Sequence, residues 1–524
     1  MKHVYFKITG IVALFVLFYV KADGQFNFGV ATSNWSGTQS LYLNPANIAD
    51  SRERFTIDII AINAGIDNNL GSVKGGIINA VNNGSNTNNL ISYSNSSKFS
   101  LLAPYAKVNG PGVMISIDHM QSVALTTAVC GMNQFNNFDR SLYQIITDPS
   151  NLPNGSSTFT SNKFNYTAQL WSEIGLSYAA VVLDKGHSEL RVGATLRYLG
   201  GIGYVGVKGN NLDVQYRSGN DTVYATNSDI EYASNLQSTN SAVFNGVGNN
   251  NVISQIFGAK DGGGVGGDLG IVYDYITDGP RDVFEMDGVA NRMDNTKNRY
   301  KLRLSASVLD LGAITYKSSN NANLEATGNG YVTGTGLSNS LGNYADFKNY
   351  LTAQNFSLDT SRHDTKVYMP TRLLFSADYK ICKRFYVNAA YVVSVVNREN
   401  FGNSYYNQVT VTPRYDTRLF SAALPITYSM LSNSMKMGVG FRVAGFFVGS
   451  DDMLALVANK QYGANVYVGG FIPFGQRRAR DRDGDGVSDR MDRCPDEFGP
   501  WENRGCPMKD QKEKDEDKDD KTTN

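Results

Sequence analysis

The feature that most constrains the fold is an alternation of apolar and polar residues with a period of two, which recurs between residues 55 and 474. Successive side chains of a β-strand point to opposite faces, so each such stretch has one apolar face and one charged or small face. The apolar members of three clear stretches are Leu190, Val192, Ala194, Leu196 and Tyr198; Leu373, Phe375, Ala377, Tyr379 and Ile381; and Met437, Val439, Phe441 and Val443. The pattern predicts an all-β chain.

The length of these stretches and of their connections favours a membrane barrel over a soluble sandwich, which would show the same alternation. Segments 167–183 and 383–397 exceed the roughly five or six residues typical of globular strands and suit a tilted membrane span of about 9–11 residues. Tight turns are predicted at 109–112 and 184–186. Short turns at one end and long loops at the other are typical of outer-membrane barrels. Long polar loops are predicted at 82–97, 133–165, 235–263 and 318–364.

Composition supports the same class. Hydrophobic residues make up 41% of the chain and the mean hydropathy is −0.29, which argues against a bundle of apolar membrane helices. In a barrel only every second strand residue must meet lipid. We therefore predict a transmembrane antiparallel β-barrel of about 14 strands, within a range of about 12–16, over residues 55–475. Aromatic residues near strand ends are expected to form interfacial girdles: Tyr405, Tyr406, Tyr467, Phe471 and Phe474.

Residues 1–24 have the pattern of a secretory signal peptide. Lys2 and Lys7 precede an apolar run from Ile11 to Val20, and small residues at 22 and 24 offer a cleavage site. The run is shorter than the about 20 residues that a transmembrane helix needs. A buried N-terminal helix is the alternative interpretation. The signal peptide predicts export, and we expect both ends of the mature chain to lie in the periplasm.

Residues 25–54 form a separate segment before the first predicted strand. Asn44 followed by Pro45 predicts a short helix, because Asn is a favoured N-cap and Pro a favoured first helical residue. Two interpretations remain open. The segment is either a lead-in to the barrel or a hatch held in the lumen near the periplasmic mouth.

Residues 476–508 carry the strongest motif in the chain. Calcium takes about six to eight oxygen ligands, and acids at positions 1, 3, 5, 9 and 12 of a loop, with a carbonyl at position 7, supply them. Gly486 stands at position 6, where the loop bends, and the last position holds Asp in place of the usual Glu. A solvated acidic linker is the alternative, which mutual repulsion of the carboxylates disfavours without a cation. The predicted calcium ligands are Asp481, Asp483, Asp485, Val487, Asp489 and Asp492.

Two cysteines follow this motif. In an oxidising periplasm Cys494 and Cys506 are expected to form a disulfide. With its spaced acids and its Cys-Pro-Asp at 494–496, the stretch 481–507 resembles a thrombospondin type 3 repeat, which implies a compact calcium-loaded spacer. Such repeats often lead to a peptidoglycan-binding domain, which does not follow here, so direct peptidoglycan binding is not expected. The charged residues 509–524 are expected to be disordered.

Charged residues on the polar faces of the strands are expected to point into the lumen. The basic ones are Arg191, Arg197, Arg303, Arg372 and Arg442, and the acidic ones are Asp268, Asp274 and Asp378. An interior salt-bridge network is favoured over a selectivity lining because both signs of charge are present. Cys130 and Cys382 are expected to be packed free thiols.

Several motifs resemble an uncharacterised family of outer-membrane barrels from gliding and type IX-secreting bacteria. They lie at 34–39, 41–46, 48–52, 300–304, 416–418, 424–425 and 463–467. The Asn-Pro-Ala segment at 44–46 also resembles the N-terminal hatch of fatty-acid-transporter-like barrels, although the rest of that family's binding pattern is not evident. The resemblance implies the architecture and leaves the solute open.

Two functions are compatible with the sequence, and neither is enzymatic. The four histidines are scattered, and no catalytic cluster can be assembled from the sequence. We favour a structural or accessory subunit of a cell-envelope assembly with a periplasmic calcium-binding tail. The alternative is a transport channel for small or apolar solutes. Expected partners are outer-membrane lipid and envelope-complex proteins that bind the tail or the barrel wall, and the zero net charge gives no reason to expect nucleic acid.

Overall fold

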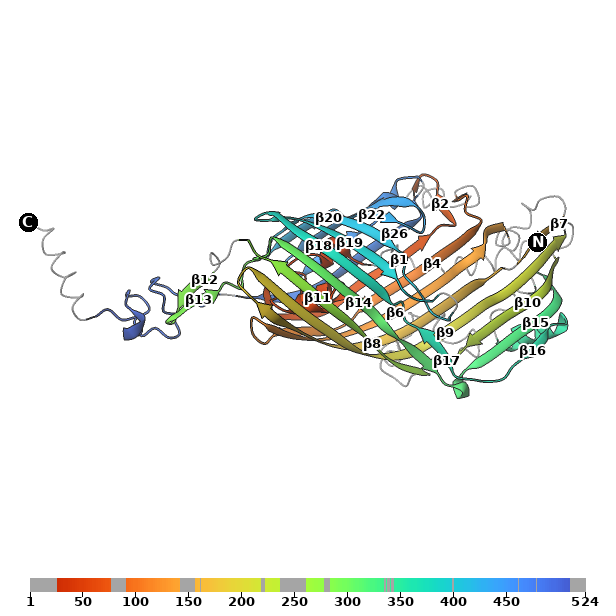
Figure 1. The fold of residues 1–524 in the computed structure, drawn as a ribbon, viewed down its shortest axis with the longest axis horizontal. Helices are drawn as coiled ribbons and strands as arrows, with labels where there is room; N and C mark the ends of the chain where they lie inside the picture. The colour runs from red at the N-terminus through yellow and green to blue at the C-terminus, as the bar shows by residue number, and fades with distance from the viewer. Residues whose placement is uncertain are drawn as a thin grey trace, which may run out of the picture.

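The barrel is closed. The computed structural model describes residues 26–76, 91–141, 156–160, 162–217, 222–235, 261–277, 283–333, 336, 340, 344–397, 400–459, 461–476 and 478–508. Its main sheet is an antiparallel barrel of 14 strands, as predicted (Figure 1). β1 closes the barrel by pairing with β26 on one side and with β4 and β5 on the other. The predicted signal peptide 1–24 and charged tail 509–524 lie outside the described residues.

The wall consists of single strands and of strands interrupted once. In chain order they are β1 (Glu53–Asn68), β4 (Lys98–Asn109) with β5 (Gly112–Ser116), β6 (Gln121–Asp139), β8 (Phe164–Asp184), β9 (Ser188–Arg217), β11 (Gly262–Tyr275), β14 (Leu302–Tyr316), β18 (Arg372–Cys382), β19 (Phe385–Ser394), β20 (Gln408–Asp416), β21 (Phe420–Ala423) with β22 (Ile426–Ser429), β23 (Ser434–Met437) with β24 (Val439–Val443), β25 (Phe446–Ser450) and β26 (Gly463–Gly475). We call the end of the barrel from which residues 478–508 project the tail end, and the opposite end the loop end (Figure 1).

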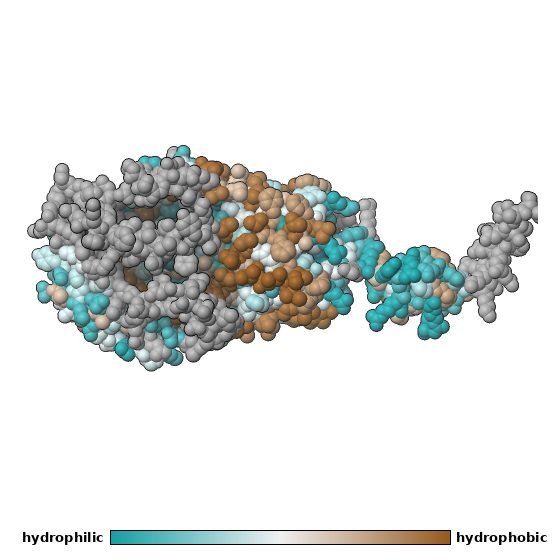
Figure 2. Space-filling model, turned by 180° about the vertical axis from the view of Figure 1, so that it is seen from behind, coloured by the Kyte–Doolittle hydropathy of each residue, from teal (hydrophilic) through white to brown (hydrophobic). Residues whose placement is uncertain are grey.

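The alternation in the sequence separates the two faces of the wall. Leu196 on β9 is 64% exposed on the outside, whereas Arg197 beside it is buried inside. Phe375 and Val443 are exposed on the outside in the same way. Figure 2 shows the result on one face of the barrel as a brown apolar band, bounded by a teal rim at the tail end. In the described part of the chain, none of the helices is long and apolar enough to cross a membrane.

One predicted turn is wrong and one is correct. Residues 109–112 do not turn: β4 and β5 run in the same direction, and both pair with β1. Pro111 has no N–H to give to the ladder, so the strand is interrupted there and then continues. The turn at 184–186 joins β8 to β9, with Gly186 at φ 75° and the Lys185 N–H bonded to the Ser188 carbonyl.

Part of a predicted loop is a folded extension of the sheet at the loop end. Within 318–364 lie β15 (Ala322–Thr333), α8 (Tyr344–Ala353) and β16 (Ser357–Asp359). The next strand, β17 (Thr365–Tyr368), begins directly after this range. β15 pairs with β10 (Thr222–Ser234), which pairs with the long end of β9. Phe347 and Leu351 are buried one helical turn apart on α8 in a cluster that includes Tyr232 and Leu324 of the sheet. Burial of this apolar face explains why the segment is not an open loop.

The predicted aromatic girdle is mostly wrong. Only Phe474 faces outward, with 50% of its surface exposed. Tyr467 and Phe471 are buried inside the barrel, where they pack in one cluster. Tyr405 and Tyr406 are buried in the lumen, because the connection that carries them folds inward. Proximity to a strand end therefore did not tell on which face a ring lies.

Candidate functional site

Residues 26–52, the hatch segment, occupy the lumen. The segment forms α2 (Phe28–Ala31), η1 (Gly37–Tyr42) and η2 (Pro45–Ile48), and contributes no strand to the wall. Phe28, Ala46 and Ala49 are completely buried. Of the two interpretations drawn from the sequence, the structure therefore supports the hatch.

Asn44 fixes η2 against the wall. As predicted, it is the N-cap residue: its side-chain oxygen accepts from the Ala46 N–H at 2.8 Å. Its amide nitrogen donates to the carbonyl oxygens of Ile271 at 3.1 Å and Ala306 at 3.0 Å, which belong to two neighbouring strands. A Cβ added to Gly270 would lie 2.0 Å from the Asn44 side-chain oxygen. The wall thus needs a glycine at this point to admit the hatch segment.

Carboxylates of the wall hold the other half of the hatch segment. The N–H group of Phe28 donates to Asp451 at 3.1 Å, and the Ser33 hydroxyl donates to Asp416 at 2.8 Å. These acids stand at different points of the wall, after β25 and at the end of β20. Buried N–H and O–H groups need hydrogen-bond acceptors. The hatch segment has no extensive hydrogen-bond ladder of its own, and these wall carboxylates supply acceptors for it.

Ion pairs fill the lumen around the hatch segment. Arg191 pairs with Asp274, and Arg303 also binds Asp274, with its Nε 2.8 Å from the carboxylate. Arg197 pairs with Asp268. These contacts agree with the network predicted from the sequence. The five predicted arginines are buried or half-buried on the inner face.

Other members of the network were missed. Asp310 joins Arg197 of β9 to Arg372 of β18. Asp378 pairs with Arg414, at 2.6 Å, and with none of the five predicted arginines. Both Asp310 and Arg414 alternate with apolar neighbours on their strands, so the pattern that found the other arginines could have found them too.

A second segment closes the lumen from the loop end. Residues 400–406, the inward segment, belong to the connection between β19 and β20 and reach β6 and β8 across the barrel. The Ser404 N–H donates to the Gln134 side-chain oxygen at 2.7 Å, and the Gln134 amide donates to the Ser404 carbonyl at 2.7 Å. The ring of Tyr405 lies 5.2 Å from that of Phe26 in the hatch segment. The two segments therefore meet inside the barrel.

The lumen toward the loop end is lined by aromatic side chains. Tyr105, Trp171, Tyr204 and Tyr316 are buried on the inner face of the wall, and they belong to the same apolar cluster as Phe26 and Tyr405. The charged network around the hatch segment contacts this cluster, because the Trp171 ring nitrogen donates to Glu173 at 2.8 Å. Charged groups also reach the cluster, since the Arg372 guanidinium lies 5.0 Å from the Phe26 ring and 4.5 Å from the Tyr405 ring. The aromatic cluster and the charged network therefore adjoin where the two segments meet.

Outside the barrel, a hairpin and the C-terminal residues pack together at the tail end. The hairpin consists of β12 (Val283–Met286) and β13 (Val289–Met293), in the connection between β11 and β14. Asp287 and Gly288 form its turn, both with positive φ. An Asp-Gly pair is among the strongest hairpin signals in a sequence, so the hairpin could have been predicted from these two residues. We call this hairpin together with residues 478–508 the tail module (Figure 1).

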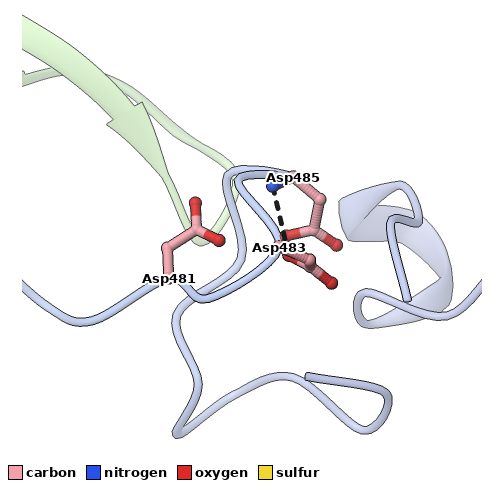
Figure 3. Close-up of side chains that lie close together, drawn as sticks. All are labelled: Asp481, Asp483 and Asp485. Atoms are coloured by element: carbon pink, nitrogen blue, oxygen red, sulfur yellow. Dashed lines mark hydrogen bonds between the residues drawn. The ribbon is translucent and has the colours of Figure 1, made fainter. Parts of the chain in front are cut away.

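Three of the predicted calcium ligands lie together in the tail module. Side-chain oxygens of Asp481, Asp483 and Asp485 are all within 4.8 Å of one another (Figure 3). Desolvation raises the pKa of Asp483, and the nearby carboxylates of Asp485 and Asp492 raise this pKa further. Oxygen donors crowded in this way fit a hard divalent cation.

The two remaining predicted acids are not in this group. Asp489 lies 3.4 Å from Arg480, and an Asp492 oxygen accepts from the Cys494 N–H at 2.7 Å. The backbone at Val487, the other predicted ligand, is held by the Asp485 side chain through its N–H at 2.7 Å.

The four cysteines fall into two classes. Cys494 and Cys506 form a disulfide that closes the end of the tail module. Cys130 is a buried free thiol inside the barrel, as expected. Cys382 is free but exposed rather than packed, because it stands at the last residue of β18, next to a tight turn.

Comparison with known proteins identifies the family. Residues 45–451 match the model of a group described as "Family of unknown function (DUF5723)". The chain belongs to this family. No curated protein matches the chain. The family's matched region includes the η2 turn of the hatch segment, most of the barrel wall and the β12–β13 hairpin, and it ends before residues 478–508.

Some solved structures are similar at low identity. A mutant of the monoaromatic hydrocarbon channel TodX shares 10% identity over 88% of this chain and 100% of its own, with a TM-score of 0.39. A FadL homologue from Pseudomonas aeruginosa shares 10% identity over 87% of this chain and 99% of its own, with a TM-score of 0.30. The toluene transporter TodX from Pseudomonas putida shares 8% identity over 86% and 98%, with a TM-score of 0.27. At this distance we draw nothing about a solute from them.

The barrel's own surface places the protein in a membrane. A sheet that closes on itself leaves no unpaired edge, and the outer face of this one carries an apolar band. Both features are required of a strand-built structure that contacts lipid. The family member is thus an outer-membrane type of β-barrel whose lumen holds residues 26–52 and 400–406 of its own chain.

Proposed function

We propose that the protein is a gated outer-membrane channel for small apolar or aromatic solutes. The observation that carries this proposal is the hatch segment, which forms no strand of the wall and occupies the lumen against a cluster of aromatic side chains. Sequence reasoning preferred an accessory subunit and kept the channel as the alternative. The aromatic lining, which alternation alone did not indicate, favours the channel.

The charges inside the barrel support an apolar solute over an ion. The buried carboxylates of Asp268, Asp274, Asp310 and Asp378 each pair with an arginine. Carboxylates paired in this way offer little field to select or concentrate an ion. By contrast, Tyr105 and Trp171 offer flat apolar faces with polar edges, which suit aromatic and small apolar molecules.

Conductance and uptake test the channel. The wild-type protein and a variant without residues 26–50 are inserted into planar bilayers and into vesicles. Removal of the hatch segment should produce discrete conductance and should speed the entry of a small aromatic probe more than that of a sugar of similar size. Absence of both effects in the deletion variant, with the barrel still folded by circular dichroism, would end the channel proposal.

Export and orientation belong to the same proposal. The N-terminal signal directs the chain through the inner membrane, and the tail end faces the periplasm. The short turns at the tail end and the longer connections at the loop end support this orientation. Protease added to intact cells should then cut at the loop end and leave residues 478–508 intact.

An accessory role is the second candidate, and the tail module favours it. Phe498 is 66% exposed and Met491 is 50% exposed on this small module, together with Val289 of the hairpin. Exposed apolar side chains outside the membrane favour a protein-binding surface when they form one patch. Cross-linking in cells followed by purification in mild detergent should recover an envelope protein bound to the module. Replacement of Phe498 by Ser should abolish that cross-link.

Calcium binding by the tail module is a further part of the proposal. Asp481, Asp483 and Asp485 would hold the cation, with the Val487 carbonyl, and Asp489 and Asp492 would complete the set. Bound calcium would neutralise the crowded carboxylates and fix the loop that carries them. Its role would be structural, since the chemistry of the ion is not needed for passage through the barrel.

A further inference from the structure

The connection between β11 and β14 contacts both the tail and the hatch segment. It leaves the barrel after Tyr275 and re-enters it at Leu302, and the β12–β13 hairpin lies within it. The tail binds one part of this connection and the hatch segment binds another. Through this connection, the position of the tail can affect the position of the hatch segment.

The tail grips the turn of the hairpin. The Asp287 N–H donates to the Gly486 carbonyl at 2.8 Å, and the Asp287 carboxylate accepts from the Ser488 N–H at 2.8 Å. These two bonds flank Val487. The Trp501 ring lies directly on the turn, since a Cβ added to Gly288 would be 2.2 Å from its Nε1 atom. One backbone hydrogen bond, one hydrogen bond to a side chain and an aromatic ring give the hairpin and the tail a defined mutual position.

Farther along the connection, the tail and the hatch segment bind within a few residues of each other. Arg478 of the tail donates through Nε to Asp294 at 3.1 Å. Arg52 of the hatch segment donates to the carbonyl oxygens of Asn295 at 3.1 Å and Lys297 at 2.6 Å. Asp294 is buried at this junction. Movement of the connection at Asp294 would therefore displace the acceptors of Arg52.

A charged clasp extends these contacts to the wall. Arg299 lies 3.6 Å from Asp50 of the hatch segment and 2.8 Å from Glu189 of β9. Asp50 also pairs with Arg52. All four side chains are nearly buried, so their interactions are little screened by salt. The end of the hatch segment is thus held by the connection as well as by the barrel wall, where Arg191 donates to the Ala49 carbonyl at 2.9 Å.

We propose that residues 283–301 are a latch, in which docking of the tail on the β12–β13 hairpin holds the end of the hatch segment closed. A periplasmic partner that draws the tail away from the hairpin would release the connection, the clasp at Asp50 and Arg52, and then the hatch segment. The inference rests on the proposed function, because it assigns the control of that channel to the tail.

Hydrogen exchange measures the latch without any transport. Exchange of the amides of residues 45–52 is compared in the wild type and in a full-length variant with Asp287→Gly and Trp501→Ala. Glycine keeps the positive φ that the turn requires, so the hairpin itself is retained. Glu285→Ala is the control, because it removes an exposed acid from the same hairpin. We expect exchange about tenfold faster in the double variant, the effect of losing about one or two net hydrogen bonds, and no change in the control.

The outcomes separate the two proposals. If the tail undocks in the double variant, as shown by faster exchange of residues 478–508, while residues 45–52 exchange as in the wild type, the latch is overturned. If residues 45–52 exchange faster and the hatch deletion still gives no conductance, the latch stands and the channel proposal falls. A second variant, Asp294→Asn, breaks the junction from the other side and should also accelerate exchange at 45–52.

Discussion

Replacement of Asn44 by Ala should release η2 from the barrel wall. The substitution removes the N-cap bond to the Ala46 N–H, worth about 1 kcal/mol, and the bonds to the carbonyl oxygens of Ile271 and Ala306, worth about 0.5–1.5 kcal/mol each. The sum is about 2–4 kcal/mol. At about 1.4 kcal/mol per factor of ten, the population with η2 released should rise by about 30- to 700-fold.

Hydrogen exchange of residues 41–49, read by mass spectrometry in detergent and in nanodiscs, measures this population. Asn47→Ala is the matched control, because the Asn47 amide donates to the Ser40 carbonyl within the hatch segment itself. The control should change exchange only slightly. Single-channel recording should show more frequent openings of Asn44→Ala than of the control. Exchange of Asn44→Ala at the wild-type rate, or an equal effect of the control, would refute the assignment of Asn44 as the anchor.

Three other predictions follow from the charged groups. A chelator should lower the protease resistance of residues 478–508 and leave the barrel unchanged, and Asp485→Ala should do the same; equal digestion with and without calcium would contradict the cation site. Arg197→Met should lower the free energy of unfolding by about 3–5 kcal/mol, because it strands buried carboxylates, whereas the more exposed Arg478→Met should cost less than about 1 kcal/mol; urea titration in micelles compares them. Burial raises the pKa of Asp294, but hydrogen bonds from Arg478 and Thr296 lower it to about 2. Its stabilisation of the docked tail is therefore present above about pH 4 and lost as the pH falls toward 2. Trp501 fluorescence should report a transition that Asp294→Asn reduces; an unchanged transition would contradict it.

Period-two alternation predicted the barrel because it has one direct physical cause. A wall between lipid and a filled lumen forces apolar and polar side chains to opposite faces, so Leu196 and Arg197 could be assigned to their sides from sequence alone. The N-cap at Asn44 was equally readable, since Asn followed by Pro specifies a local helix start. These features depend on neighbours in the sequence or on the strand period.

Features that depend on contacts between residues far apart in the chain could not be predicted from the sequence. The inward turn of residues 400–406 depends on Gln134, more than 250 residues away in the chain. Tyr405 looked like a girdle residue because both an interface and an apolar lumen accept an aromatic ring. The interruption at Pro111 resembled a turn because proline and glycine are common in turns and also in interrupted strands. Only the pairing of β4 and β5 with the same strand, β1, distinguishes an interruption from a turn. The contacts of the tail with the hairpin were likewise unpredictable, because they depend on both segments leaving the barrel at the same end.

The bridge that Asp310 makes between β9 and β18 also constrains how the wall can be assembled. If β14 were shifted by one residue against its neighbours, Asp310 would face hydrocarbon, and Arg197 and Arg372 would be left inside without it. A charge exposed to the centre of a bilayer costs several kcal/mol, which is a large share of the stability of one strand pair. The same side chains that fill the closed barrel therefore reject slipped arrangements while it is being built, and a variant with neutral residues at these three positions would be expected to insert with more than one register.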